Sequence, residues 1–259
     1  MRTRRIVLLI VALALALIAL TGCFIKRNGT TVSSSYTYSS AANYNVGPAS
    51  VDASKISELE VDWVSGSIKV VYGRVRAIEI DESVKKGKIS EDEQLRWIVE
   101  GGKLRIKFAK SGLNLISNLN KDLVITVPEG IVFKKTDIDS VSADATVEVA
   151  SDAYEFDQVS GDVTLTSDWA GSVDVDSVSG KAVLTFSRCP SSIEVGTVSG
   201  DAVVRIPANS GFKLKFDTVS GKMDCSIPAT VSGKEMVAGD GKAGFKFDSV
   251  SGDVKIESI

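Results

Sequence analysis

Hydrophobic and polar residues alternate through most of the C-terminal half of the chain, and a Val-Ser-Gly tripeptide interrupts the alternation at regular intervals. The positions two and four residues after each glycine are apolar, as are those five and seven residues before it. Alternation with a period of two predicts β-strands, and the glycine predicts a tight corner between two of them. The predicted corner glycines are Gly161, Gly180, Gly200, Gly221 and Gly252, with an alanine in the equivalent place at Ala143 and an isolated early copy at Gly66.

The spacing of these corners indicates how the strands are arranged. Successive corners from residue 143 to residue 221 are 18, 19, 20 and 21 residues apart, and the last interval, to residue 252, is 31. A nearly constant period indicates a repeat protein, in which each two-strand unit buries its apolar side by stacking on the next copy, about 4.8 Å away. A β-propeller or sandwich would have longer repeats or Asn-Gly hairpin turns. The pattern therefore predicts an all-β, parallel β-solenoid whose rungs, each of two strands and a corner, have about 18–21 residues.

The solenoid domain is expected over residues 51–259, with diverged rungs over 51–135 and regular repeats over 136–259. Within the diverged part, apolar alternation on both sides of Glu100-Gly-Gly-Lys103 predicts an antiparallel hairpin, which we interpret as a cap over an open sheet end.

Two further segments stand out in this domain. Residues 123–127 predict a strand that Pro128 ends. Residues 228–244 contain several glycines without apolar alternation, and they predict a projecting loop.

The N-terminus predicts export. Three early arginines, an apolar run over residues 6–20 and a small-residue exit are typical of a cleaved signal peptide over residues 1–22. Leu20-Thr21-Gly22-Cys23 also resembles the bacterial lipobox, which implies lipidation of Cys23. We therefore expect a lipid anchor in the cell membrane or the outer membrane, with the rest of the chain facing the periplasm or the cell exterior.

A polar segment follows the lipobox. Residues 23–50 are rich in Ser, Thr, Asn and Tyr and have no apolar period, so they predict a flexible tether that follows the lipidated cysteine. Tyr36, Tyr38 and Tyr44 lie in this segment, either as parts of a solvated linker or as a recognition motif.

Composition excludes several kinds of chemistry. The chain has no histidine, which removes Ser-His and Cys-His nucleophile pairs and most transition-metal sites, so we expect no cofactor. Cys189 and Cys225 are predicted to lie two rungs apart, beyond the about 7 Å reach of a disulfide, and to be free. The formal charge of −3 becomes −6 when the arginines of the signal peptide are removed, and this acidity disfavours nucleic acid as a partner.

Aspartates recur four residues before the corners, with Gly196 as an interruption. A stacked column of carboxylates could bind Ca²⁺, for which Asp139, Asp157 and Asp176 are the candidates. The alternative interpretation is that each aspartate accepts hydrogen bonds from its own turn. The full column comprises Asp62, Asp139, Asp157, Asp176, Asp217 and Asp248.

Charged residues also follow the corners directly. From Asp162 onward they alternate between aspartate and lysine, which predicts a ladder of opposite charges with Lys181 between Asp162 and Asp201. Lys222 is expected between Asp201 and Asp253 unless the long last interval displaces the last rung.

The repeated Val-Ser-Gly-Asp corners and the strand Leu123-Val-Ile-Thr-Val-Pro128 before them resemble the bacterial putative-adhesin β-repeat domain family, a domain of unknown function. The resemblance covers about residues 51–259. It implies a right-handed β-solenoid at the cell surface, and it supplies no catalytic residues to transfer.

These observations lead to a prediction of function. We expect a non-enzymatic surface lipoprotein whose solenoid has an adhesin-like binding or structural role in the cell envelope, with an unknown protein or a cell-wall polysaccharide as partner. Two alternatives remain open: a β-helix polysaccharide lyase or hydrolase that uses the aspartate column, and a sensor of envelope state. Against the enzyme, Trp63, Trp97 and Trp169 are scattered along the sequence rather than gathered beside paired carboxylates.

Overall fold

The computed structural model of the chain describes residues 35–114 and 119–259. The predicted signal peptide, Cys23 and the first part of the predicted tether lie outside the described residues. Within the described ranges, no helix is long and apolar enough to cross a membrane.

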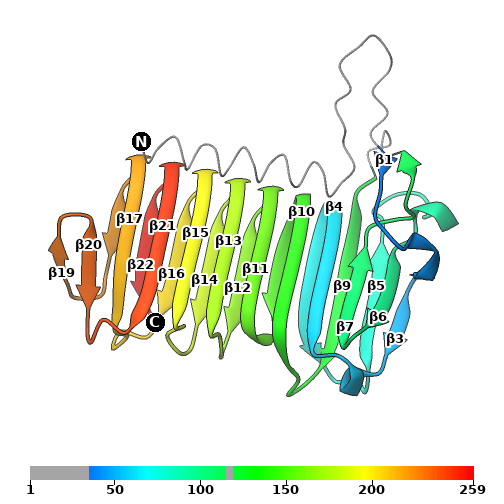
Figure 1. Cartoon of the computed structure of the whole chain (residues 1–259), viewed down its shortest axis with the longest axis horizontal. Coiled ribbons are helices and arrows are strands. Elements are labelled where there is room, and N and C mark those ends of the chain that lie inside the picture. The colour runs from blue at the N-terminus through cyan, green and yellow to red at the C-terminus, as the bar shows by residue number, and fades with distance from the viewer. Residues whose placement is uncertain (1–34, 115–118) are drawn as a thin grey trace, which may run out of the picture.

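The described chain is an all-β parallel solenoid, as predicted (Figure 1). The strands before the corners pair side by side into what we call the first sheet, and those after the corners form the second sheet. β4 and β10 run through their corners and contribute one half to each sheet. In spatial order the first sheet contains β7 (Lys103–Lys107), β4 (Glu58–Gly73), β10 (Val132–Glu148), β11 (Ala150–Ser160), β13 (Ser172–Ser179), β15 (Ser192–Ser199), β21 (Ala243–Ser251) and β17 (Phe212–Ser220). The second contains β9 (Lys121–Pro128), β4, β10, β12 (Val163–Ser167), β14 (Ala182–Phe186), β16 (Ala202–Ile206), β22 (Val254–Ser258) and β18 (Met223–Cys225).

The hydrophobic core lies between the two sheets and follows the predicted alternation. Phe156 of β11 and Leu165 of β12 are both fully buried, whereas their neighbours Glu155 and Thr164 are not. Each rung therefore points every second side chain inward, and the stacked rungs make one continuous core.

The corner glycines are required mainly by the close stacking of the rungs. A Cβ on Gly180 would lie 2.0 Å from the carbonyl oxygen of Gly161, and one on Gly200 would lie 2.1 Å from that of Gly180. Only some corners also have a positive φ, for example 127° at Gly180. Ala143 has no positive φ, so an alanine is accommodated at that corner without backbone strain.

The order of the rungs differs from the order of the sequence at the C-terminal end. The last rung, β21 and β22, is inserted between β15/β16 and β17/β18, so the expectation that each copy stacks on the next in the sequence is wrong there. The charge ladder changes with it. Lys181 donates its N–H to Asp162 (2.8 Å) as the predicted order requires, but Asp253 follows Asp201 directly (2.9 Å) and Lys222 comes last.

The diverged N-terminal part contains the predicted hairpin but fewer rungs than expected. β6 (Arg96–Glu100) pairs antiparallel with β7, with Trp97 opposite Ile106, and β9 ends at Pro128, so both predictions are confirmed. In the described part of the chain, β7 and β9 form the one further rung, which stacks outside β4. Four further strands are antiparallel caps over that rung: β5 (Ile78–Ser83) and β3 (Ala49–Val51) on the second sheet, and β6 and β2 (Asn45–Val46) on the first.

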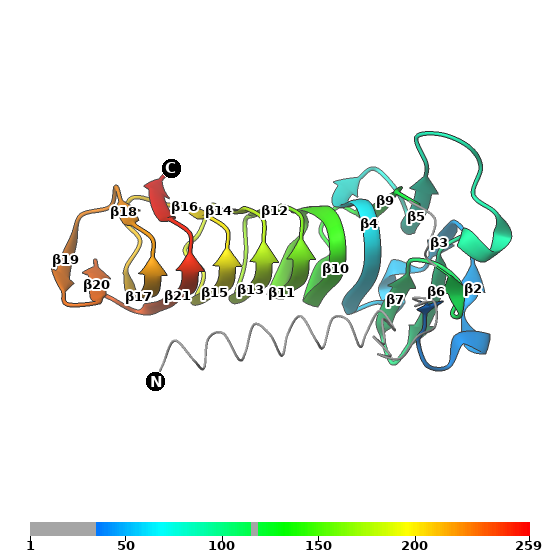
Figure 2. The ribbon, with the colours of Figure 1, turned by 90° about the horizontal axis from the view of Figure 1, so that it is seen from above.

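Residues 228–244 are not the projecting loop that their glycines predicted. They form β19 (Ala229–Ser232) and β20 (Glu235–Ala238), an antiparallel hairpin, and β20 pairs with β17. Figure 2 shows this hairpin at one end of the stack and the N-terminal caps at the other. The hairpin pairs with β17, the last strand of the first sheet, and so covers backbone N–H and C=O groups that would otherwise be unpaired.

The predicted tether is wrong for residues 35–50, which are folded. β1 (Ser35–Tyr36) pairs with β8 (Leu113–Asn114), and Tyr36 is only 2% exposed in the core. Short 3-10 helices follow at η1 (Ala41–Asn43) and η2 (Ala53–Lys55), and a third is η3 (Glu91–Glu93). Aromatic packing explains the difference, since the tyrosine rings of this segment bury apolar area that its composition alone did not indicate.

Candidate functional site

The outward side of the first sheet has an unusual density of carboxylates. Side chains alternate along each strand, so every second residue points into the core and the residues between them point outward. Because the strands pair in parallel, equivalent outward residues of neighbouring strands lie next to one another. We name this side the acidic face and define it by Asp137, Asp139, Glu155, Asp157, Asp174, Asp176 and Glu194.

The predicted aspartate column is one of its two rows. Asp157 of β11 lies between Asp139 of β10 and Asp176 of β13 in the register, so these candidate residues are brought together. At the interruption, a Cβ on Gly196 would lie 2.2 Å from Oδ1 of Asp176, so a side chain there would have to displace this carboxylate. The Asp176 carboxylate thus occupies the space that a side chain on the next strand would need.

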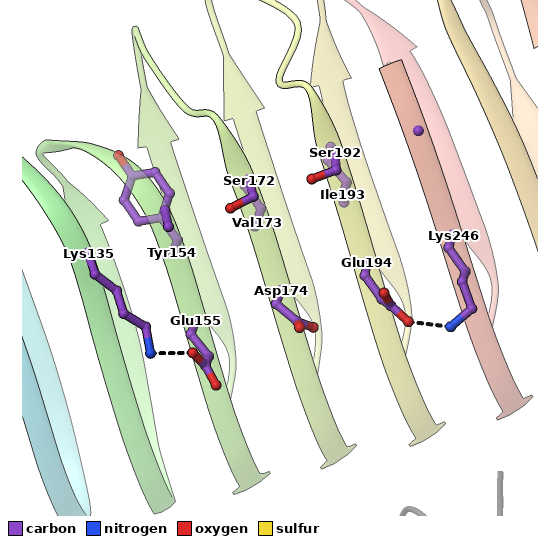
Figure 3. A pocket seen from close by; sticks show the side chains of 12 residues that line it. Lys135, Tyr154, Glu155, Ser172, Val173, Asp174, Ser192, Ile193, Glu194 and Lys246 are labelled. Atoms are coloured by element: carbon purple, nitrogen blue, oxygen red, sulfur yellow. Dashed lines mark hydrogen bonds and ion pairs between the residues drawn. The ribbon is translucent and has the colours of Figure 1, made fainter. Parts of the chain in front are cut away.

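The second row lies two residues earlier in each strand, and it was missed in the sequence although it has the same period. Glu155, Asp174 and Glu194 are neighbours in the register. Lysines neutralise the two ends of this row, since Lys135 forms an ion pair with Glu155 and Lys246 forms one with Glu194 (Figure 3). Asp174, in the middle, makes no ion pair with any of the described residues.

The protonation of this face reflects its crowding. Burial raises the pKa of Asp157 to about 7, and the neighbouring Asp139 and Asp176 carboxylates add to the effect. Burial, followed by the charge of Asp137, likewise raises the pKa of Asp139 to about 7. Burial and the flanking carboxylates Asp176 and Glu194 raise the pKa of Asp174 to about 6. These negative charges therefore oppose one another in the folded protein.

A shallow groove runs beside the second row. Small residues at the same position of successive strands, among them Ser172, Ser192 and Gly244, form its floor, and Lys135 and Lys246 stand at its two ends. Its volume is about 260 Å³. Figure 3 shows Asp174 between Glu155 and Glu194 along one side of this groove. The arrangement is suited to a ligand that carries positive charge at its centre.

The surroundings of the aspartate column bear on both of its interpretations, Ca²⁺ binding and hydrogen bonding to the turns. No hydrogen bond from a turn reaches Asp139, Asp157 or Asp176 within the described ranges, so the expectation that each accepts bonds from its own turn is wrong. That role belongs to the residues just after the corners, for example Asp144, which accepts the Asp162 N–H at 2.9 Å. Among residues 35–114 and 119–259, no group of three or more Asp, Glu, His or Cys side chains has an arrangement suited to a metal ion.

The cysteines are the other predicted site residues. Cys23 lies outside the described residues. Cys189 and Cys225 are both free thiols, as predicted, and both pack partly buried against the core.

Comparison with known proteins finds one matching family and solved structures with a similar fold. Residues 130–257 match the family described as Toastrack DUF4097. A crystal structure of a putative cell adhesion protein from Clostridium sporogenes is similar, with a TM-score of 0.51 and 14% identity over 83% of this chain and 100% of that chain. A putative adhesin from Bacteroides fragilis has a TM-score of 0.46 and 13% identity, over 83% of this chain and 97% of that chain. No curated protein matches the sequence.

The low identities mean that the structural similarity establishes the fold alone. The family match covers the region of regular rungs, where the Val-Ser-Gly corners recur and the strands of each sheet pair in parallel. Residues 130–257 of this chain are therefore similar to the family described as Toastrack DUF4097.

Proposed function

We propose that this chain is an exported, lipid-anchored, non-enzymatic surface protein whose solenoid binds a positively charged partner in the cell envelope through the acidic face. The lipobox at Leu20–Cys23 supports export and anchoring. A protein with a similar fold is described as a putative cell adhesion protein, which agrees with a role in binding.

The observation that carries the proposal is the uncompensated charge at the centre of the acidic face. Carboxylates with raised pKa values, such as Asp157 and Asp174, destabilise the folded state when they ionise. Placing these side chains next to one another therefore lowers the free energy of unfolding. Among the described residues, neither a turn hydrogen bond nor an ion pair offsets this cost at Asp157 or Asp174. Groups with strongly shifted pKa values cluster at functional sites, and a field of one sign attracts a partner of the other.

Binding is favoured over polysaccharide cleavage. A glycosidase places two carboxylates beside rings that stack on sugars. Tyr154 is the aromatic residue among those that line the groove, and its ring is only 1% exposed. The groove thus offers charge complementarity without a surface for a sugar ring.

Capture of partners from intact envelopes tests this proposal. The full-length protein with a C-terminal affinity tag is compared with a triple variant, Glu155→Gln, Asp174→Asn and Glu194→Gln. The matched control neutralises three exposed carboxylates elsewhere, with Glu129→Gln, Glu148→Gln and Asp224→Asn. We expect the wild type and the control to retain a common partner at low salt, and the triple variant to lose it.

Ionic strength provides a second criterion, because exposed charges are screened over about 10 Å at 0.1 M salt. Capture should weaken steeply as salt rises. Equal capture by the triple variant and the control would overturn the role of the acidic face.

The anchor is tested separately. Wild type should incorporate radiolabelled palmitate, and Cys23→Ser should lose the label. A labelled Cys23→Ser protein would contradict the proposed anchor.

A further inference from the structure

A second pocket lies at the N-terminal cap, away from the groove of the acidic face. It has a volume of about 300 Å³, at the lower end of the range for ligand sites. Its walls come from the segment before β2 and from β4, β6 and β7, so it exists only because residues 35–46 fold onto the cap.

Aromatic rings form one side of this pocket. Tyr36 is buried against Phe108, Tyr38 packs edge-on against Tyr36, and Tyr44 packs edge-on against Tyr38 with ring centroids 5.0 Å apart. Tyr38 is held further by its hydroxyl, which donates to the carbonyl of Ala109 at 3.2 Å. Tyr44 is the outermost ring of this series. Its hydroxyl has no hydrogen-bond partner among the described residues, and its ring is partly exposed at the surface.

Charged groups of both signs form the other side, and ion pairs hold them in place. Glu60 bonds to Arg105 at 3.2 Å and to Lys107 at 3.4 Å, while Arg105 also bonds to Glu100 at 2.9 Å. The two carboxylates that line the pocket are matched by the two cations that line it. The pocket is therefore close to neutral, unlike the acidic face, and does not select its ligand by net charge.

The rim supplies small polar groups in a constrained loop. Ser39, Ser40 and Asn43 line the pocket, and their side chains make no hydrogen bond to other described residues. Ser40 has φ 56°, the left-handed conformation, and it is the one non-glycine residue in the described ranges with a positive φ. Its side chain does not cap η1, so its hydroxyl is free to contact a ligand. Strained residues of this kind are enriched at functional sites.

We propose that this pocket binds a neutral saccharide. A sugar presents hydroxyl groups that both donate and accept, which matches fixed carboxylate oxygens beside Arg and Lys donors. Its C–H faces are apolar and pack on an aromatic ring, the position that Tyr44 offers. The near-neutral lining and the small volume favour a short, uncharged segment of a glycan. This site is separate from the acidic face and does not depend on the function proposed for it.

Ligand-observed NMR on the purified full-length protein, in a detergent without sugar groups, tests the proposal. The probes are glucose, galactose, mannose, N-acetylglucosamine and the β-1,4 disaccharides of glucose and of N-acetylglucosamine. We expect saturation transfer to at least one probe. Tyr44→Ala should weaken its binding about tenfold, because stacking on the ring is lost, whereas Tyr44→Phe should retain it.

The control variant is Trp169→Ala, which removes an exposed aromatic ring far from the pocket on the turn after β12. It should bind the probe as the wild type does. As a check that needs no variant, the probe should shift the amide resonances of residues 38–44 and 105 in the wild type. Absence of binding by all probes, unchanged binding by Tyr44→Ala, or loss in Trp169→Ala would overturn the proposal. A negative result for saccharide binding would leave the expected envelope capture by the acidic face unchanged, so the two proposals can fail independently.

Discussion

The backbone N–H of Lys222 donates a 2.7 Å hydrogen bond to the carboxylate of Asp253, a residue that follows it by 31 positions in the chain. Asp253 in turn donates its own N–H to Asp201 at 2.9 Å. The two bonds place the last rung of the sequence between the two that precede it. The rung of β17 and β18 therefore does not contact the rung of β15 and β16. The last rung, which follows the β19–β20 hairpin in the sequence, lies between them.

Engineered disulfides should report this order of rungs. Val203 of β16 pairs directly with Lys255 of β22, and Lys255 pairs with Asp224 of β18. In a background with Cys189→Ala and Cys225→Ala, we expect Val203→Cys with Lys255→Cys to form a disulfide on mild oxidation, detected by peptide mapping. Adjacent strands lie about 4.8 Å apart, within the reach of a disulfide.

The matched control combines Val203→Cys with Asp224→Cys. These positions would be neighbours if the rungs stacked in sequence order, but they lie two rungs apart here, about 9.6 Å and beyond the about 7 Å limit. Efficient bond formation in the control, with none in the first pair, would contradict the inserted rung.

Three glycine substitutions should separate rung stacking from backbone conformation. Gly200→Ala meets a carbonyl oxygen at 2.1 Å with an ordinary φ, and Gly130→Ala meets nothing within 4 Å but has φ 85°. Gly180→Ala combines a contact of 2.0 Å with φ 127°. We expect losses of about 1–3 kcal/mol for Gly200→Ala, about 1 for Gly130→Ala, and the largest for Gly180→Ala.

Denaturant unfolding followed by circular dichroism measures these differences. A smaller loss for Gly200→Ala than for Gly130→Ala would mean that the corners need glycine for its φ and not for close stacking.

The fold was largely predictable from the sequence because one short unit with a period of two recurs. Leu165 and Phe156 could be assigned to the core from their offsets alone, and both are fully buried. The order of rungs could not be predicted, since Ala202 could pair equally well with Met223 or Val254, which have the same offset from their corners. Sequence offsets specify which residues are equivalent, but not which equivalents are neighbours.

The sites were less predictable than the fold. The row of Asp139 and Asp157 followed from the repeat, and the row of Glu155 and Asp174 could have been found at the same period two residues earlier. The pocket beside Tyr44 could not, because it depends on how a segment of low hydrophobicity folds onto a distant hairpin.

A buried ion pair should be essential to the N-terminal cap. Lys121 and Glu82 are almost completely buried, with their charged atoms 2.6 Å apart, and the Lys121 ammonium also donates to the carbonyl of Glu93 at 2.6 Å. Burial lowers the pKa of Lys121. Lys121→Met leaves the Glu82 charge buried without a partner, so we expect a loss of about 3–5 kcal/mol in chemical denaturation.

A double variant distinguishes that cost from a simple loss of packing. Glu82→Gln keeps the oxygen that accepts the Leu95 N–H at 2.8 Å while removing the charge. Lys121→Met with Glu82→Gln should therefore be more stable than Lys121→Met alone. If the two losses simply added, the ion pair would have no special role in the cap.

The acidic face should make stability fall as pH rises, with a sign opposite to that of ion-paired carboxylates. The folded pKa of Asp157, about 7, lies above the unfolded value of about 3.9, so the folded state binds this proton more tightly. Its contribution to stability is fully present below about pH 4 and is lost as the pH rises through about 7. Asp139 and Asp174 act in the same direction. We expect the melting temperature of the wild type to decrease between pH 5 and pH 8.

Asp157→Asn tests this cause, since it removes the central charge of the aspartate column and keeps the shape of the side chain. At pH 8 it should raise the melting temperature by about 2–4 °C, which corresponds to about 1 kcal/mol for a chain of this size once solvent screening is allowed for. At pH 5 the gain should be smaller, because the wild-type carboxyl is already largely protonated there. Asp224→Asn, on the exposed side of β18, is the control and should change neither value. A Tm of Asp157→Asn that lies below that of the wild type at pH 8 would mean that the carboxylate stabilises the fold, and the argument that the acidic face is retained for binding would lose its basis.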